Sequence, residues 1–143
     1  MDEAEPKSRG RTVILDSNFL FIPLQFGLDI FEDLERLLGC LVRCVVPSPV
    51  VDELKLLKQD AKPSLRKEVD FALALSENCE RIEEKAELGE TADDVLLRLA
   101  KRWKCPVATN DSELKRRLRA EGLPVIFLRQ RAYLDIEGAL QSR

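Results

Sequence analysis

Short apolar segments alternate with longer amphipathic ones along this chain, and this alternation constrains the fold more than any other feature. Four segments are short and rich in apolar or β-branched residues, as buried strands are: 12–16, 40–47, 105–109 and 123–128. Five longer segments repeat apolar residues at helical spacing: 28–39, 48–59, 62–78, 91–104 and 111–122. Strands that alternate with helices pair in parallel and are covered on both faces. We therefore expect an α/β fold with a central, mostly parallel sheet.

The rest of the chain sets the domain limits. Its 143 residues suit one domain with a substantial core. Residues 1–10 are polar and contain no apolar signal-peptide centre, and no apolar run reaches transmembrane length. We expect a flexible tail over 1–10, one domain over 11–143, and a cytoplasmic protein without membrane contact. Residues 79–90 read as an acidic connector with room for a short strand, and 129–140 as a polar segment that packs outside the sheet or leads away.

The chain contains no histidine, and this removes much catalytic chemistry. Ser-His-Asp and Cys-His catalysis both require an imidazole. Zinc of the finger type is disfavoured as well, because the four cysteines form no C-x-x-C pair. We expect them to be buried thiols, and nothing in their spacing supports a disulfide. With 26 acidic residues, a metal held by oxygen ligands stays open.

Acidic residues follow the predicted strands at the ends where ligands bind in such folds. Asp16 ends the first strand, and Asp111 comes two residues after the strand 105–109. Glu53 lies one turn into the helix that follows the second strand, with Ser48 as its expected cap. Ligands in open parallel sheets bind beyond the carboxyl ends of the strands. These three carboxylates are therefore expected to gather at one edge of the sheet.

A fourth acid comes from the pair Asp93-Asp94. Thr91-x-x-Asp94 resembles a helix capping box, which gives Asp94 a structural role. Asp93 instead heads the apolar stripe formed by Leu96, Leu97 and Ala100. Asp93 is thus the better candidate for the site, and Asp94 is the reserve. Asp111 too can be read simply as a helix cap.

Carboxylates that converge on one point repel each other unless a cation lies between them. Oxygen ligands alone suit Mg²⁺ or Mn²⁺, which bind substrate phosphates through a few carboxylates. Two such ions about 4 Å apart activate a water and stabilise the leaving oxygen of a phosphodiester. Asn18 and Thr109 are placed to orient the carboxylates or their waters.

Charge is unevenly distributed although the net charge is only −3. Eight acidic residues lie between Glu77 and Asp94, and eight basic ones between Arg98 and Arg119. The second group suggests contacts with a phosphate backbone, although solvated helix faces explain it equally well. The candidate RNA-binding residues are Lys101, Lys104, Lys115, Arg116, Arg117 and Arg119. Trp103 could stack a base but lies on an apolar stripe, which favours a place in the core.

Several of these motifs together resemble PIN-domain nucleases. They are "LDSNFL" from Leu15, "DEL" from Asp52, "TADDVLLRLA" from Thr91, and "VATNDSELKRRLR" from Val107. The resemblance runs from about Thr12 to Leu128 and is strongest to archaeal single-domain proteins of VapC type and to Fcf-type nucleases of ribosome biogenesis. Ser17 differs from the common threonine of that family but keeps a hydroxyl.

The resemblance implies a Rossmann-like α/β/α three-layer sandwich and Mg²⁺- or Mn²⁺-dependent hydrolysis of single-stranded RNA. Carried over by position, the metal-binding and catalytic acids are Asp16, Glu53, Asp93 or Asp94, and Asp111, with Thr109 as the hydroxyl two places before the last. An antitoxin protein and a second copy of the chain are the implied protein partners. The alternatives are a PIN-like module that binds RNA or protein without cleavage, and an aspartate-based phosphatase or receiver domain. The phosphatase reading is weakened because Asn18 stands where its second aspartate belongs.

Overall fold

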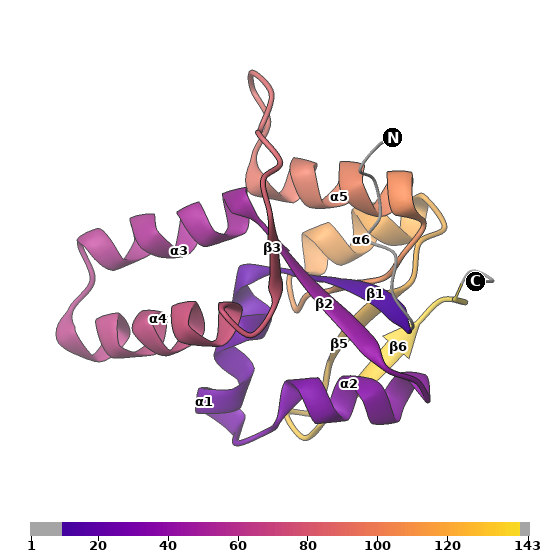
Figure 1. Ribbon diagram of the computed structural model, residues 1–143, viewed down its shortest axis with the longest axis horizontal. Helices are drawn as coiled ribbons and strands as arrows, with labels where there is room; N and C mark the ends of the chain where they lie inside the picture. The colour runs from indigo at the N-terminus through magenta and orange to yellow at the C-terminus, as the bar shows by residue number, and fades with distance from the viewer. Residues whose placement is uncertain (1–9, 141–143) are drawn as a thin grey trace.

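The computed structural model describes residues 10–140, in which six strands form one sheet (Figure 1). Its spatial order is β3-β2-β1-β4-β5-β6. The strands are β1 (Arg11–Leu15), β2 (Val42–Pro47), β3 (Glu80–Ile82), β4 (Val107–Ala108), β5 (Val125–Arg129) and β6 (Tyr133–Glu137). All neighbours pair in parallel except β5 and β6, which are antiparallel. The predicted α/β fold with a mostly parallel sheet is therefore confirmed.

Helices lie on both faces of this sheet. They are the 3₁₀ helix η1 (Ser17–Phe21) and the α-helices α1 (Ile22–Phe26), α2 (Ile30–Leu38), α3 (Ser48–Gln59), α4 (Pro63–Ser76), α5 (Ala92–Trp103) and α6 (Ser112–Ala120). Figure 1 shows α2 on one side of the sheet, α5 and α6 on the other, and α3 and α4 extending sideways as a pair. The chain order reverses direction at β1, and right-handed crossovers then place α5 and α6 opposite α2. Within residues 10–140, no helix is long and apolar enough to cross a membrane.

The central strands and the inner faces of the helices form the core. Val13, Ile14 and Leu15 of β1 are completely buried, as expected for a strand with parallel neighbours on both sides. Trp103 is only 8% exposed and belongs to the same hydrophobic cluster. This confirms the core position expected from its apolar stripe. None of the four cysteines forms a disulfide; Cys44 and Cys105 are buried thiols, as expected, whereas Cys40 and Cys79 are half-buried.

The segment 129–140 differs from its predicted course. Instead of packing outside the sheet or leading away, it supplies β6, which pairs with β5 along its whole length. Leu134 is buried and Ile136 packs against the core. The alternation of Tyr133, Leu134 and Asp135 is the period of a half-buried edge strand, and it was missed because the polar residues dominate the composition. The apolar residues Leu134 and Ile136 are thus used inside the chain.

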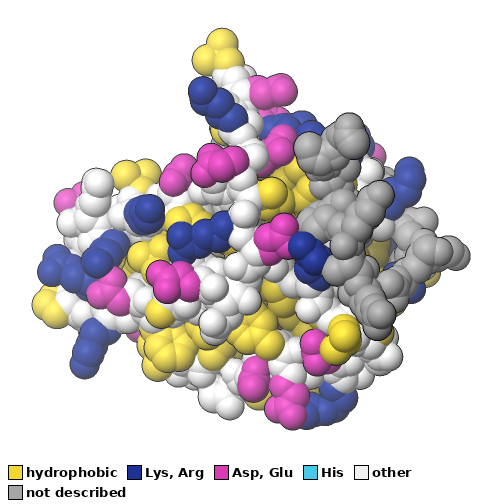
Figure 2. All heavy atoms as spheres, in the orientation of Figure 1, with side chains coloured by type: hydrophobic (Ala, Val, Ile, Leu, Met, Phe, Trp, Pro, Cys, Tyr) yellow, Lys and Arg dark blue, Asp and Glu magenta, His cyan; other side chains and the backbone are white. Residues whose placement is uncertain are grey.

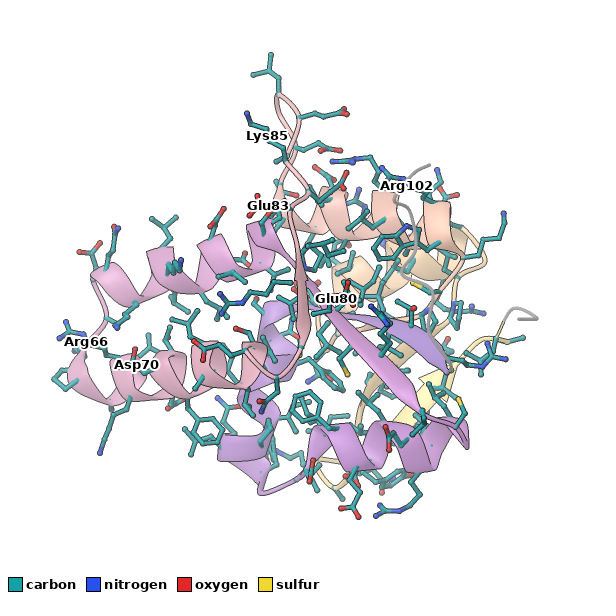
Figure 3. The ribbon with its side chains drawn as sticks, viewed as in Figure 1. Arg66, Asp70, Glu80, Glu83, Lys85 and Arg102 are labelled. Carbon is teal, nitrogen blue, oxygen red and sulfur yellow. The ribbon has the colours of Figure 1, made fainter. Side chains whose placement is uncertain are left out.

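The acidic connector projects from the body of the molecule between β3 and α5 (Figure 1). Figure 3 shows Glu83 and Lys85 on this projection, and Arg102 on α5 beside it. Arg98 of α5 donates to Glu84 at 2.5 Å and to Glu90 at 2.8 Å, and Arg102 donates to Glu84 at 3.3 Å. Two acids of the connector, Glu84 and Glu90, are therefore paired with arginines of α5.

The start of α3 also differs from expectation. Pro47, not Ser48, is the cap residue of α3, and it makes no side-chain capping hydrogen bond. The hydroxyl of Ser48 instead accepts a hydrogen bond of 3.0 Å from the backbone N–H of Glu84. Ser48 thereby fixes the connector to α3.

Candidate active site

Asp16 is the centre of the candidate site. It follows β1 and caps η1, and only 3% of its surface is exposed. Its Oδ1 accepts a hydrogen bond of 2.7 Å from the backbone N–H of Ser17. Its Oδ2 accepts hydrogen bonds from the hydroxyl of Thr109 at 2.7 Å and from the side-chain amide of Asn18 at 3.0 Å. Three donors thus compensate the burial of this carboxylate and fix its orientation.

Glu53 reaches the same place from α3. The hydroxyl of Ser17 donates a hydrogen bond of 2.9 Å to Oε1 of Glu53. Ser17 directly follows Asp16, so this bond joins the first two acidic residues of the site through neighbouring positions of η1. The retained hydroxyl at position 17 therefore holds Glu53.

Asp93 and Asp94 have different environments at the start of α5. Asp94 completes a capping box with Thr91, through bonds of 2.9 Å and 3.2 Å, and it accepts a hydrogen bond of 2.7 Å from Arg117. These two partners lower the pKa of Asp94. Asp93 lines the cavity that Asp16 also lines, and Asp94 does not. The structure thus gives Asp94 a capping role and turns Asp93 toward the site.

Asp111 and Asn18 complete the arrangement around Thr109. Asp111 caps α6 by accepting a hydrogen bond of 2.9 Å from the backbone N–H of Leu114. The backbone N–H of Asp111 donates to the hydroxyl of Thr109 at 3.0 Å. The amide oxygen of Asn18 accepts a hydrogen bond of 3.0 Å from the backbone N–H of Asn110. These hydrogen bonds tie the loop after β4 to the segment after β1. Asp111 is therefore a helix cap, as one interpretation of the sequence expected, and it also lines the cavity.

Four carboxylates line one small, open cavity of about 230 Å³. Its lining residues are Asp16, Ser17, Asn18, Glu53, Thr91, Ala92, Asp93 and Asp111. The four acids come from the end of β1, from α3, from α5 and from the start of α6. They meet at the carboxyl edge of the sheet because β1 and β4 are neighbouring parallel strands.

Burial and mutual repulsion shift the titration of these acids. Burial raises the pKa of Asp16 above its ordinary value of 3.8, and Glu53 and Asp111 raise it further, whereas the hydrogen bonds from Thr109 and Ser17 lower it. Burial also raises the pKa of Asp93 to about 6, and the negative charges of Asp16 and Asp111 add to this effect. The acids therefore interact electrostatically, and a cation in the cavity would relieve their repulsion.

The donor set of this cavity fits a hard divalent cation. Its lining offers carboxylate, hydroxyl and amide oxygens but no sulfur or imidazole. Within residues 10–140, no three Cys, Asp or Glu side chains lie close enough together to enclose an ion by themselves. Mg²⁺ does not require such a cage, because it keeps several waters and binds through one or two carboxylates.

Most of the basic residues expected to contact RNA already have acidic partners. Five of them pair with acidic side chains: Lys101 with Glu121, Lys115 and Arg119 with Glu137, Arg116 with Glu113, and Arg117 with Asp94. Lys101 and Lys104 lie about 12 and 16 Å along α5 from Asp93 at 1.5 Å per residue. Figure 2 shows basic, acidic and hydrophobic side chains mixed over the visible face. Of the six, only Lys115 lines a cavity next to the acidic one.

That neighbouring cavity contains residues that sequence reasoning missed. It has a volume of about 540 Å³, and its lining includes Phe26, Phe127 and Arg131. The aromatic residues resembled ordinary core positions in the sequence, and Arg131 lay in the segment expected to leave the sheet. Arg131 lies beside α1 because β6 folds back on β5. Recognising this hairpin in the sequence would have placed Arg131 there.

The geometry agrees with the similarity of this chain to known proteins. Residues 13–131 match the family model described as "PIN like domain", which is most of the chain. The chain belongs to the PIN-like domain family. Among solved structures, this PIN-like domain is similar to the one described as the PIN domain endonuclease Utp24, with a TM-score of 0.74 and 29% identity over 90% of this chain and 92% of that one. The expected fold family is therefore confirmed.

Relatives of this PIN-like domain carry nuclease names. It is 34% identical to Ribonuclease VapC4 of Methanocaldococcus jannaschii, over 88% of this chain and 96% of that protein. It is 29% identical to Ribonuclease VapC9 of Archaeoglobus fulgidus, over 89% and 90%. It is also 34% identical to rRNA-processing protein fcf1 of Schizosaccharomyces pombe, over 80% of this chain and 57% of that protein. The PIN-like domain thus has relatives among ribonucleases and RNA-processing proteins.

Proposed function

We propose that this protein is an endoribonuclease that hydrolyses phosphodiester bonds of single-stranded RNA with bound Mg²⁺ or Mn²⁺. The observation that carries the proposal is the single cavity lined by the carboxylates of Asp16, Glu53, Asp93 and Asp111. Separately, each of these acids has a structural explanation. Their convergence from four segments on one cavity has no structural explanation, because the repulsion between four carboxylates destabilises the fold unless a cation binds.

We assign the residues by their surroundings. Asp16 and Asp93 face the cavity, and the pKa of each is raised. A bound cation would stabilise the ionised form of these two carboxylates most, so we assign them as metal ligands. Thr109 and Asn18 orient Asp16, and Ser17 orients Glu53. Asp94 is left out of the ligand set because its oxygens already serve Thr91 and Arg117. A bound ion would supply an activated water and neutralise the leaving oxygen.

A module that binds RNA without cleaving it is the competing function. Such a module has no need to keep four repelling carboxylates together, since any one of them could be lost without harm to binding. The intact cavity therefore favours the nuclease. An antitoxin chain over the acidic cavity and a homodimer stay predictions, and light scattering of the purified chain would test the second.

The decisive experiment compares cleavage of an end-labelled single-stranded RNA with Mn²⁺ by wild type, Asp16→Asn and Asp60→Asn. Asp60 is an exposed aspartate that ends α3, so Asp60→Asn makes the same chemical change away from the cavity. We expect wild type and Asp60→Asn to cleave and Asp16→Asn to be inactive. Calorimetry with Mn²⁺ should give a heat of binding that only Asp16→Asn loses. Equal cleavage by wild type and Asp16→Asn would disprove the proposal.

A further inference from the structure

A second cavity, which we call the aromatic groove, lies directly beside the acidic one. Its lining includes Phe21 and Phe26 from η1 and α1, Phe127 from β5, Lys115 from α6, and Arg131 from the turn before β6. Asn18 lines both cavities, so they share a wall. The two cavities are therefore adjacent, and neighbouring nucleotides of one strand could occupy both.

The lining of the aromatic groove is opposite in charge to the acidic cavity. Lys115 and Arg131 line it, and no carboxylate does. Cations already lie on its rings: Nζ of Lys115 is 3.8 Å and the guanidinium carbon of Arg129 is 4.9 Å from the ring centre of Phe127. The guanidinium carbon of Arg131 is 5.9 Å from the ring centre of Phe26. Aromatic faces beside cations are what proteins use to hold single-stranded nucleic acid, and the rings of Phe21, Phe26 and Phe127 are each half-buried.

The turn between β5 and β6 brings Gln130 and Arg131 into this groove beside α1 (Figure 1). Both residues have left-handed backbones, with φ of 55° and 56°. An Asn-Gly pair would adopt this turn with less strain. The chain instead carries two long polar side chains there, and both line the groove. Strain of this kind is kept where the side chain has a use.

Given the nuclease proposed above, we propose that the aromatic groove holds the base of a nucleotide next to the bond to be cleaved. The base stacks on Phe127 or Phe26, and Lys115 and Arg131 bind the neighbouring phosphates. A base on Phe127 displaces Lys115 or Arg129 from the ring, and the displaced cation then exchanges its carboxylate partner, Glu137 or Asp135, for a phosphate. The groove volume of about 540 Å³ lies in the range of small-ligand sites, about 300–1,000 Å³. An apolar protein segment would bring no anion to Arg131 or to Lys115, whose carboxylate partner Glu137 is not part of the groove lining. RNA brings phosphates to both cations, which favours RNA as the occupant.

Binding can be measured separately from cleavage. The probe is a fluorescein-labelled single-stranded 2′-O-methyl RNA oligonucleotide in EDTA, which the protein cannot cut, and the readout is fluorescence anisotropy. We expect Phe127→Leu to weaken binding about ten-fold, as the loss of one stacked base does. Phe127→Trp should retain the affinity because it keeps a stacking face. Phe71→Leu is the matched control, since Phe71 is an exposed phenylalanine on α4, outside the groove.

Two further arms separate the base from the phosphates. With an abasic oligonucleotide, wild type and Phe127→Leu should bind equally. Arg131→Gln should reduce the slope of log affinity against log salt by about one, whereas Arg36→Gln on α2 should not. Absence of binding by wild type, or equal loss in Phe127→Leu and Phe71→Leu, would overturn the proposal. Unchanged RNA affinity together with a dimer that Phe127→Leu dissociates would overturn it in favour of a second copy.

The outcome also separates the two proposals. If wild type binds the oligonucleotide through Phe127 but never cleaves RNA with Mn²⁺, the groove stands and the nuclease fails. If wild type cleaves RNA while the groove variants bind and cleave like Phe71→Leu, the nuclease stands and the groove fails.

Discussion

The hydroxyl of Thr109 donates a hydrogen bond of 2.7 Å to Oδ2 of Asp16, across 93 positions of sequence. The same hydroxyl accepts a hydrogen bond of 3.0 Å from the backbone N–H of Asp111. Thr109 is completely buried and Asp16 nearly so. One side chain therefore fixes the distance between two of the four acids of the site.

Thr109→Val should test this link, because it keeps the shape of the side chain and removes only the hydroxyl. Asp16 then loses one donor and the backbone N–H of Asp111 loses its acceptor, so the free energy of unfolding should fall by about 1–3 kcal/mol. Affinity for Mn²⁺ should fall as well. Urea denaturation and calorimetry measure the two effects. Thr109→Ser keeps the hydroxyl and should stay close to wild type; a valine variant as stable as wild type would contradict the prediction.

Asp93→Asn and Asp94→Asn form a second test, with neighbouring residues and identical chemistry. We expect Asp93→Asn to lose Mn²⁺ binding and RNA cleavage, because it removes a carboxylate that lines the cavity. Asp94→Asn should lower the melting temperature by weakening the capping box and the contact with Arg117, and should keep metal binding. The reverse pattern would show that Asp94 is the ligand.

Asp93 also predicts how the stability of the metal-free protein depends on pH. Burial raises its pKa to about 6 from 3.8, so the folded protein binds this proton more tightly than the unfolded chain. The neutral Asp93 carboxyl therefore contributes to the free energy of unfolding fully below about pH 3.8, and this contribution is lost as the pH rises through about 6. In EDTA, Asp93→Asn should therefore gain stability over wild type across this window and keep the gain above it. Urea denaturation at a series of pH values measures the free energy of unfolding of both proteins. A difference between them that does not change with pH would refute the prediction.

Ser17→Ala should release Glu53 from its hydrogen bond of 2.9 Å. Residues that orient metal ligands typically contribute 10–100-fold to metal affinity, and Ser17 is partly exposed, so we expect a loss of about ten-fold. Ser17→Thr should restore the affinity because it keeps the hydroxyl. Calorimetric titration with Mn²⁺ decides between the variants, and an alanine variant that binds as tightly as wild type would rule out this role.

Local patterns in the sequence were sufficient for the fold class and for the sheet edge at which Asp16 and Asp111 meet, but not for β6. Strands such as 12–16 and the strong capping signal at Thr91 are readable from neighbouring residues alone. The rule that sites lie at the carboxyl edge then brings Asp16 and Asp111 together. The cap of α3 was assigned wrongly because the true partner of Ser48, the backbone N–H of Glu84, is 36 positions away.

Contacts between distant segments could not be predicted in this way. The acidic run and the basic run looked like separate surfaces, whereas Glu84 and Glu90 pair with Arg98. The aromatic groove forms only because β6 folds back beside β5. The polar residues of β6 obscured the alternating pattern that would have predicted this strand. Ion pairs and shared cavities follow from tertiary packing, which a single sequence shows only indirectly.

The position of β4 between β1 and β5 has a consequence during synthesis of the protein. A ribosome adds residues from the N-terminus, so Asp16 and Glu53 emerge long before the chain that carries Thr109 and Asp111. Until β4 inserts beside β1, Asp111 and the hydroxyl of Thr109 are not held beside Asp16, and the acidic cavity lacks one of its four acids. The acidic cavity therefore forms only once β4, the strand that follows α5, has joined the sheet.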